Sequence, residues 1–313
     1  MFLMLPATIP LHYVARLLVY IKEALLEESL TRNLASGEWK NFLESRLKDD
    51  TKIWLNGSKE LLKKLITKGR LRCVPAGLNN HLANCTNWNY EQWCGEALAS
   101  HDSEALQGII TTKTVIDKFP NRSKIAASID KLSSVEWWRS RSPSLRLHRT
   151  TNDYLKSLNL VFKCSNSIMF IDPYLSPDRR NYKEFYKLLE VISQYNNSAL
   201  IEIHRVVYSE SGKDRILFKP EEMENLFRKN LPESIKSAKL KIEVFVWDDF
   251  HDRYLISNLI GIKLSNAFDL DDNPQAKTTW ARLGRNDRDD IQREFHPASR
   301  EHKMQYQFSL NGS

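Results

Sequence analysis

Cysteine is scarce in this sequence: the 313 residues contain four, and none forms a Cys-x-x-Cys pair. The histidines and cysteines of the first half do not follow the paired spacing of zinc ligands. The residues considered are His81, Cys85, Cys94 and His101. We therefore predict no metal site, and we expect no cofactor.

Long apolar runs are also missing. The longest run near the N-terminus is too broken for a membrane span of about 20 apolar residues. It is interrupted by His12, Arg16, Lys22 and Glu23. No signal-peptide pattern of a basic start, an apolar middle and a small-residue cleavage site is present. We therefore expect a cytoplasmic protein without a membrane span, in which the cysteines are reduced thiols.

The remaining composition is that of a globular protein. Hydrophobic residues make up 42% and charged residues 27%, which excludes the disordered and fibrous classes. A chain of 313 residues is long enough for two domains. Lysine and arginine exceed the acidic residues by seven, and the isoelectric point is about 9.1. This surplus favours a polyanionic partner such as nucleic acid, although many soluble proteins carry as much.

Residues 1–140 are predicted to form a mainly helical domain of unknown role. Apolar residues recur at helical spacing over residues 11–25 and 39–47. A further helix is expected around residues 90–99. Residues 70–74 have the composition of a short strand.

Residues 133–149 are rich in Ser and Arg and indicate a junction between domains. Beyond them, strands and helices alternate, which predicts an α/β domain over residues 146–273 with a mixed sheet flanked by helices. Strand character is expected in four runs, at residues 168–172, 199–204, 241–247 and 253–257. Residues 274–313 are predicted to be a charged C-terminal extension.

The segment most indicative of a function runs from Phe250 to Asn258 and reads FHDRYLISN. Side chains two residues apart on a strand point to the same face. One phosphate group could therefore contact both the imidazole of His251 and the guanidinium of Arg253.

This segment, together with the order of the four strands, resembles one half-unit of the phospholipase D superfamily. The signature of that family is His-x-Lys, four residues, Asp, and then a Gly-Ser turn. The resemblance places His251 at the nucleophile and Arg253 at the phosphate-binding lysine. Asn258 stands where the family has Asp, and Ser265 and Asn266 stand at the Gly-Ser turn, so these three are candidate substrate-binding residues. Bacterial proteins that share the Asp-Pro-Tyr-Leu and His-Asp-Arg-Tyr blocks are similar and uncharacterised.

In that family one histidine attacks phosphorus, a second protonates the leaving oxygen, and no metal is required. A functional unit therefore needs two such motifs, and this sequence contains one. An active site would require a homodimer, or a second histidine from elsewhere in the chain, for which His204 at the end of the second strand is the candidate. Asp172 and Tyr174 follow the first strand, and Arg149 precedes the first helix. These three are candidate substrate-binding residues at one sheet edge.

Two classes of function remain open. The first is a metal-independent nuclease in a bacterial defence or DNA-processing system, with His251, Arg253 and His204 as catalytic residues. The second is a catalytically inactive phosphate-binding or scaffold module that contacts nucleic acid, anionic lipid or a protein partner. The retained His251 favours the first class, whereas Arg253 and Asn258 in place of the family's Lys and Asp favour the second. His204 is also explained as a satisfied core histidine, and Asp172 as a residue that begins a turn.

Overall fold

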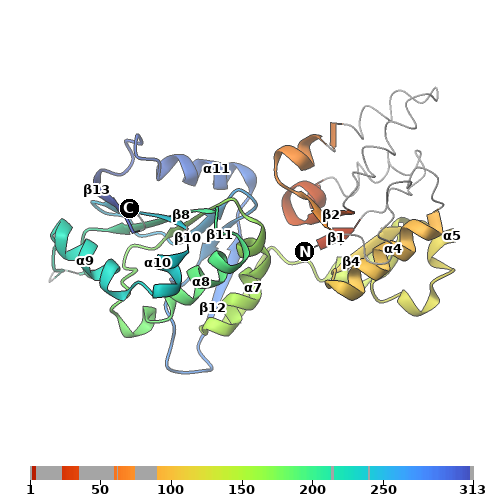
Figure 1. Ribbon diagram of the computed structural model, residues 1–313, viewed down its shortest axis with the longest axis horizontal. Coiled ribbons are helices and arrows are strands. Elements are labelled where there is room, and N and C mark those ends of the chain that lie inside the picture. The colour runs from red at the N-terminus through yellow and green to blue at the C-terminus, as the bar shows by residue number, and fades with distance from the viewer. Residues whose placement is uncertain are drawn as a thin grey trace. The chain divides into compact units, whose positions relative to one another are not determined.

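The computed structural model describes residues 2–4, 23–34, 60–61, 63–74, 90–212, 215–238 and 240–310. The chain divides into two compact units, Met1–Arg141 and Ser142–Ser313 (Figure 1). The division falls inside the Ser/Arg-rich segment 133–149. The expected helices at 39–47 and over most of 11–25 lie outside the described residues. In the described part of the chain, no helix has the length and apolar character needed to cross a membrane.

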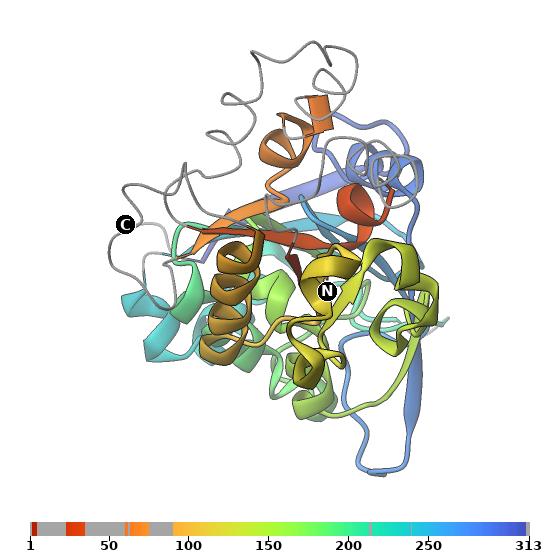
Figure 2. The same cartoon turned by 90° about the vertical axis from the view of Figure 1, so that its right-hand side faces the viewer.

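The first unit is built on a five-stranded parallel sheet, seen in Figure 2. Its strands lie in the order β3-β2-β1-β4-β5. They are β1 (Phe2–Met4), β2 (Leu30–Leu34), β3 (Leu71–Val74), β4 (Gly108–Thr111) and β5 (Ala126–Ser128). The helices described with them are the π-helix η1 (Ala24–Glu28), α4 (Tyr90–Ser103), α5 (Lys113–Ile116), η4 (Pro120–Arg122), η5 (Ile129–Ser134) and α6 (Glu136–Arg139).

Most strands of this sheet are not predicted from the sequence. The strand at residues 70–74 and the helix near residue 90 are present as β3 and α4, but the helical spacing predicts a mainly helical region. β1, β4 and β5 are only three or four residues long, and every residue of β4 and β5 is buried. Strands this short and fully buried show no alternation that distinguishes them from helix.

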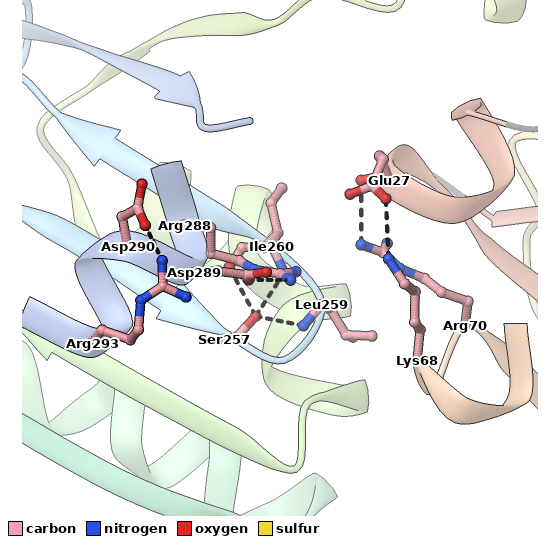
Figure 3. Close-up of polar contacts among 10 residues, drawn as sticks. All are labelled: Glu27, Lys68, Arg70, Ser257, Leu259, Ile260, Arg288, Asp289, Asp290 and Arg293. Carbon is pink, nitrogen blue, oxygen red and sulfur yellow. Dashed lines mark hydrogen bonds and ion pairs between the residues drawn. The ribbon is translucent and has the colours of Figure 1, made fainter. Parts of the chain in front are cut away.

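A buried arginine fastens the turn before β3 to the residues before β2 (Figure 3). Arg70 is 4% exposed and donates hydrogen bonds to the main-chain carbonyls of Ser29, at 3.2 Å, and Glu27, at 3.3 Å. Lys68 adds an ion pair with the Glu27 carboxylate at 3.3 Å. These bonds satisfy carbonyl groups at the end of η1, where the helix provides no further amide donors.

The second unit contains an eight-stranded mixed sheet that includes all four predicted strand runs. Its order is β13-β9-β8-β7-β10-β11-β12-β6. The predicted runs are β7 (Ser167–Ile171), β8 (Leu200–Val206), β9 (Lys241–Trp247) and β10 (Tyr254–Ser257); the other strands are β6 (Ser144–His148), β11 (Gly261–Leu264), β12 (Lys277–Arg282) and β13 (Met304–Ser309). β7, β8 and β9 are parallel, and the other neighbours are antiparallel. The predicted α/β class with a mixed sheet is confirmed.

Helices cover both faces of this sheet. One face packs against α7 (Thr151–Cys164), α8 (Phe185–Tyr195), α9 (Pro220–Asn230) and α10 (Glu233–Ser237), and the other against α11 (Arg285–Glu294). Along β7 the side chains alternate between them: Phe170 belongs to the first core, whereas Met169 and Ile171 belong to the second. We call these two sides the α8 face and the α11 face.

Residues 274–310 contribute two strands to this sheet, which differs from the predicted charged extension. β12 pairs with β11 and β6, and β13 pairs with β9. In β12, Thr278 and Trp280 are buried while Lys277 and Thr279 are exposed. A strand with one buried face is half polar, so a charged composition alone does not separate such a strand from an extension.

Candidate functional site

Asp172 follows β7 directly and continues the alternation that points Phe170 to the α8 face. Its side chain is fully buried. The carboxylate accepts hydrogen bonds from the Tyr182 hydroxyl at 2.8 Å and from the main-chain amides of Tyr174, at 3.2 Å, and Phe268, at 3.3 Å. Burial raises the pKa of Asp172 above its usual value, and these donors oppose the rise only in part.

A cavity of about 260 Å³ lies beside this hydrogen-bond network, and we call it the Arg253 cavity. It is formed by the segments that follow β7, precede β10 and follow β11. Its lining residues are Tyr174, Arg179, Asn181, Tyr182, Arg253, Ser265, Asn266, Ala267 and Asp269. Four residues nominated from the sequence therefore meet here, namely Tyr174, Arg253, Ser265 and Asn266, and Asp172 lies behind them, bonded to Tyr182.

Two guanidinium groups line the Arg253 cavity. Arg253 is half-buried and donates a hydrogen bond to the main-chain carbonyl of His251 at 3.1 Å. Within the described residues, Arg253 forms no ion pair with a carboxylate. Arg179 donates to the Ser209 carbonyl at 2.5 Å and lies 3.7 Å from the Glu210 carboxylate. At least one of the two arginines thus keeps its charge free for a ligand.

The cavity carries an excess of positive charge. One carboxylate lines it, that of Asp269, and this group is already paired with Arg149 at 2.5 Å. The buried Oδ1 atom of Asp269 has no hydrogen-bond partner among the described residues. Hydroxyl and amide groups that can donate hydrogen bonds to an oxyanion come from Tyr174, Asn181, Ser265 and Asn266. The arrangement suits a small anion better than a cation.

His251 does not line this cavity, and its side chain is exposed. β10 begins at Tyr254, so His251 and Arg253 lie in the loop that joins β9 to β10. Strand alternation does not hold there, and the expectation that both side chains share one strand face is not met. Phe250 fixes the start of this loop by packing on Phe295, with ring centroids 4.9 Å apart.

Arg149 reaches the same sheet edge but is held there by two carboxylates, Asp269 at 2.5 Å and Asp271 at 2.6 Å. It lines a second cavity of about 410 Å³, which we call the Arg149 cavity. The lining residues are Arg149, Thr150, Thr151, Arg180, Asn181, Lys183, Glu184, Leu270, Asp271 and Asp272. Asn181 lines both cavities, so the two are neighbours.

His204 is a core residue and lies apart from both cavities. It pairs in register with Ile171 and is fully buried on the α11 face. Its ring stacks on Phe245, 4.9 Å between centroids, and its Nδ1 accepts a hydrogen bond from Trp247 Nε1 at 3.1 Å. Nε2 lies 3.2 Å from the Glu202 carboxylate. Burial lowers the pKa of His204, and Glu202 opposes this only in part. The structure therefore contradicts His204 as a second catalytic histidine.

Asn258 lies at the opposite end of the strands from the Arg253 cavity, because it follows β10 whereas Arg253 precedes it. β10 is antiparallel to β7, and Ser257 pairs with Ile168 near the start of β7, whereas Asp172 follows its end. The Asn258 side chain accepts hydrogen bonds from the amides of Asn166, at 2.9 Å, and Ser167, at 3.4 Å. Asn258 is thus a turn residue and not a substrate contact.

The turn that begins with Ser257 is closed by its hydroxyl group, which accepts hydrogen bonds from the amides of Leu259 and Ile260 at 3.2 and 3.0 Å (Figure 3). The hydroxyl lies 3.1 Å from the Ile260 carbonyl, to which it donates. These bonds set the tight connection from β10 to β11, and so the register that carries Ser265 to the Arg253 cavity.

Five cavity residues were not nominated from the sequence as contacts: Arg179, Asn181, Tyr182, Ala267 and Asp269. Three of them lie within ten residues after Asp172, and this proximity to a strand end is the signal that could have found them. Residue order does not show which of these side chains turn inward. The Arg180 side chain is 78% exposed, whereas Tyr182 is 4% exposed.

In the described part of the chain, no group of three or more His, Cys, Asp or Glu side chains is arranged to hold a metal ion. His81 and Cys85 lie outside that part. Cys94 is buried in α4, and burial raises the pKa of its thiol to about 11. A thiol with such a pKa is protonated at neutral pH and is a poor metal ligand.

The comparisons with known proteins give no close relative of this chain. No family model matches the chain, and neither does any curated protein. Among solved structures, TrmBL2, an archaeal chromatin protein whose structure shows a novel mode of DNA binding, aligns over 76% of this chain and 78% of its own. The sequence identity is 12% and the TM-score 0.30. A likeness of this size establishes neither a shared fold nor a shared ligand.

Proposed function

We propose that the second unit is a phospholipase D-like module whose Arg253 cavity binds a phosphate group of a phosphodiester, with nucleic acid as the ligand. The observation that carries this proposal is the meeting of Arg253 and Arg179 in one small polar cavity whose lone carboxylate is already paired. The net charge of +7 for the whole chain is consistent with a polyanionic ligand.

The chemistry of the lining fits a phosphate. Arg253 forms no direct ion pair with a carboxylate among the described residues, although its charge acts on the buried Asp172 and opposes the rise in pKa that burial causes there. A guanidinium offers a planar fork of donors that matches two phosphate oxygens. The hydroxyl groups of Tyr174 and Ser265 can donate to the remaining oxygens. Asp172 is held back from the ligand by its bonds to the Tyr182 hydroxyl and to the main-chain amides of Tyr174 and Phe268.

Binding without cleavage is the function that the geometry supports best. Phosphohistidine chemistry needs two histidines at the phosphorus atom. His204 is buried on the other face of the sheet, and the exposed His251 is not among the cavity residues. A metal-independent nuclease is the second candidate, and what favours it is the hydrogen bond from Arg253 to the His251 carbonyl. That bond holds the loop that carries His251 next to Arg253. One histidine would then be near the phosphate, and a second copy of the chain could supply the second histidine that this chemistry needs.

The test measures binding of fluorescently labelled single-stranded oligonucleotides by anisotropy, in EDTA, with the whole chain. Arg253→Ala removes a charge-assisted hydrogen bond worth about 1.5–3 kcal/mol, so the dissociation constant should rise about tenfold or more. The salt dependence of binding should also become shallower, by about 0.7 in slope for one lost phosphate contact on a single strand. The matched control is Arg293→Ala, which removes an exposed arginine paired with Asp290 on α11. Equal weakening by the two variants would overturn the proposal.

The two candidate functions are separated by His251→Ala and by gel analysis of the same oligonucleotides. A binding module leaves them intact, and His251→Ala keeps the affinity of the unaltered protein. A nuclease cleaves them in EDTA, and His251→Ala abolishes cleavage while binding persists. Cleavage that survives His251→Ala would exclude phosphohistidine chemistry at this position.

A further inference from the structure

The Arg149 cavity adjoins the proposed phosphate site and differs from it in chemistry. The lining of the Arg253 cavity holds two arginines and one carboxylate. The Arg149 cavity holds three cationic and three carboxylate side chains, so its formal charge is balanced. Its two arginines are already paired with its own acids, Arg149 with Asp271 at 2.6 Å and Arg180 with Asp272 at 3.0 Å. A second phosphate would meet three carboxylates there, and balanced charge does not favour it.

The lining of the Arg149 cavity suits a group that both donates and accepts hydrogen bonds. Nine of its ten lining residues are polar or charged, and Leu270 is the exception. An acyl chain would leave these polar groups without partners. Glu184 already accepts a hydrogen bond from the Thr151 hydroxyl and pairs with Lys187 at 3.1 Å, but a carboxylate has about four lone-pair sites. A hydroxyl group can therefore still donate to Glu184 or Asp272, and it can accept from Lys183. Among biological ligands, a sugar offers several such hydroxyls close together.

One network of side chains connects the two cavities, which points to one ligand in both. Asn181 lines both cavities, and its amide lies 3.5 Å from the Asp269 carboxylate of the Arg253 cavity. Arg149 bridges Asp269 to Asp271 of the second cavity. A group bound in the Arg149 cavity therefore lies next to a phosphate bound in the Arg253 cavity. In a nucleic acid, the group next to every phosphate is a sugar.

We propose that the Arg149 cavity binds a ribose next to the phosphate held in the Arg253 cavity, and that the ligand is RNA rather than DNA. This inference rests on the proposed function and names its substrate class. The 2′-hydroxyl, which is both donor and acceptor, distinguishes RNA from DNA at a given site. Carboxylates are suitable acceptors for it, as an acidic side chain is for a nucleotide ribose in dinucleotide-binding folds. Glu184 and Asp272 are the acceptors to which we assign this role.

The test compares two labelled decamers of one sequence, oligouridylate and oligodeoxyuridylate, in binding to the whole chain. One hydrogen bond to a charged acceptor changes the affinity by about tenfold to a hundredfold, so the ribo-oligomer should bind tighter by that factor. Glu184→Gln or Asp272→Asn should reduce this preference. The control Glu233→Gln, which removes a carboxylate of α10 that is 84% exposed, should keep it. Arg253→Ala should weaken both oligomers equally and leave their ratio unchanged.

Failure of this inference is distinguishable from failure of the proposed function. Equal affinity for the two oligomers, with both sensitive to Arg253→Ala, overturns the ribose assignment and leaves the phosphate site in place. A ribose preference that survives both Glu184→Gln and Asp272→Asn overturns the assignment to the Arg149 cavity. Binding of neither oligomer, with binding of vesicles that contain phosphatidylglycerol, overturns both proposals.

Discussion

Asp172 and His204 are neighbours in the sheet, yet they lie in two different environments. The amide of Asp172 donates to the His204 carbonyl at 3.0 Å, at the end of the parallel pair β7 and β8. Asp172 points to the α8 face and is bonded to Tyr182 of the Arg253 cavity. His204 points to the α11 face, between Phe245, Trp247 and Phe295. Asp172 directly follows the end of β7, and His204 lies two residues before the end of β8; only Asp172 adjoins a cavity.

The difference shows that proximity to a strand end does not make a site. Parallel strand ends collect ligand-facing residues in open α/β sheets, but each strand offers two faces, and here α11 and Phe295 fill one of them. The same division separates Arg253 from Tyr254, which follows it and belongs to the α11 core. A site on one face and a core on the other should respond differently to mutation and to pH.

The largest effect is expected from His204→Ala. This change empties a position inside an aromatic cluster and leaves the Trp247 indole N–H without its acceptor. The free energy of unfolding should fall by about 2–4 kcal/mol, as measured by urea denaturation. Oligonucleotide affinity, measured where the variant is still folded, should not change. A loss of affinity with unaltered stability would place His204 in the site after all.

A smaller effect is expected from Tyr182→Phe, on the other face. The change removes the hydroxyl donor from the buried Asp172 carboxylate, which should cost about 1–3 kcal/mol of stability. The matched control is Tyr186→Phe, since the Tyr186 hydroxyl is also buried but donates to the neutral Phe227 carbonyl at 2.8 Å. The control should cost about 0.5–1.5 kcal/mol. Urea denaturation at pH 7 compares the two variants. An equal loss of unfolding free energy would show that Asp172 stabilises its hydrogen bond no more than a neutral carbonyl does.

The two residues should contribute opposite pH dependences of stability. The pKa of His204 is lowered in the folded state by burial, so the unfolded chain binds more protons just below pH 6.5 and stability falls as the pH falls there. The pKa of Asp172 is raised by burial, so the folded chain binds more protons just above pH 3.8 and stability falls as the pH rises there. Each slope is at most about 1.4 kcal/mol per pH unit.

Unfolding free energies between pH 4 and 8 measure both contributions. His204→Gln should flatten the decline below pH 6.5, and Asp172→Asn should remove the opposite decline above pH 3.8. Unchanged pH profiles in both variants would show that neither residue titrates differently in the folded and unfolded states.

The smallest effect is expected from Asn258→Ala. The side chain accepts hydrogen bonds from two turn amides at the far edge of the sheet, and its loss should cost about 0.5–1.5 kcal/mol. Thermal denaturation measures this change. Oligonucleotide affinity should stay that of the unaltered protein, and a tenfold loss of affinity would return Asn258 to the ligand site.

The pattern of residues along the chain is enough to predict the α/β class and the four strands that later prove to share one sheet, because period and composition are local properties. It also leads to the expectation that Asp172, Tyr174 and Arg253 lie near one another, since each is next to a strand end, whereas Ser265 and Asn266 were nominated through the family resemblance. It does not reveal the parallel sheet of the first unit, whose strands are three to five residues long and in which β4 and β5 are fully buried, so that they show no period.

Only the tertiary structure decides which polar groups remain available to bind a ligand. Arg149 is neutralised by Asp269 and Asp271, about 120 residues away in the sequence, and no local pattern reports such a pair. His204 points to the face of the sheet on which α11 packs, and Asp172 points to the other face. Because β10 runs antiparallel to β7, Asn258 lies at the far end of the strands from the cavity. These outcomes depend on long-range packing and pairing, whereas the residue pattern determines only which chemical groups are present near each strand end.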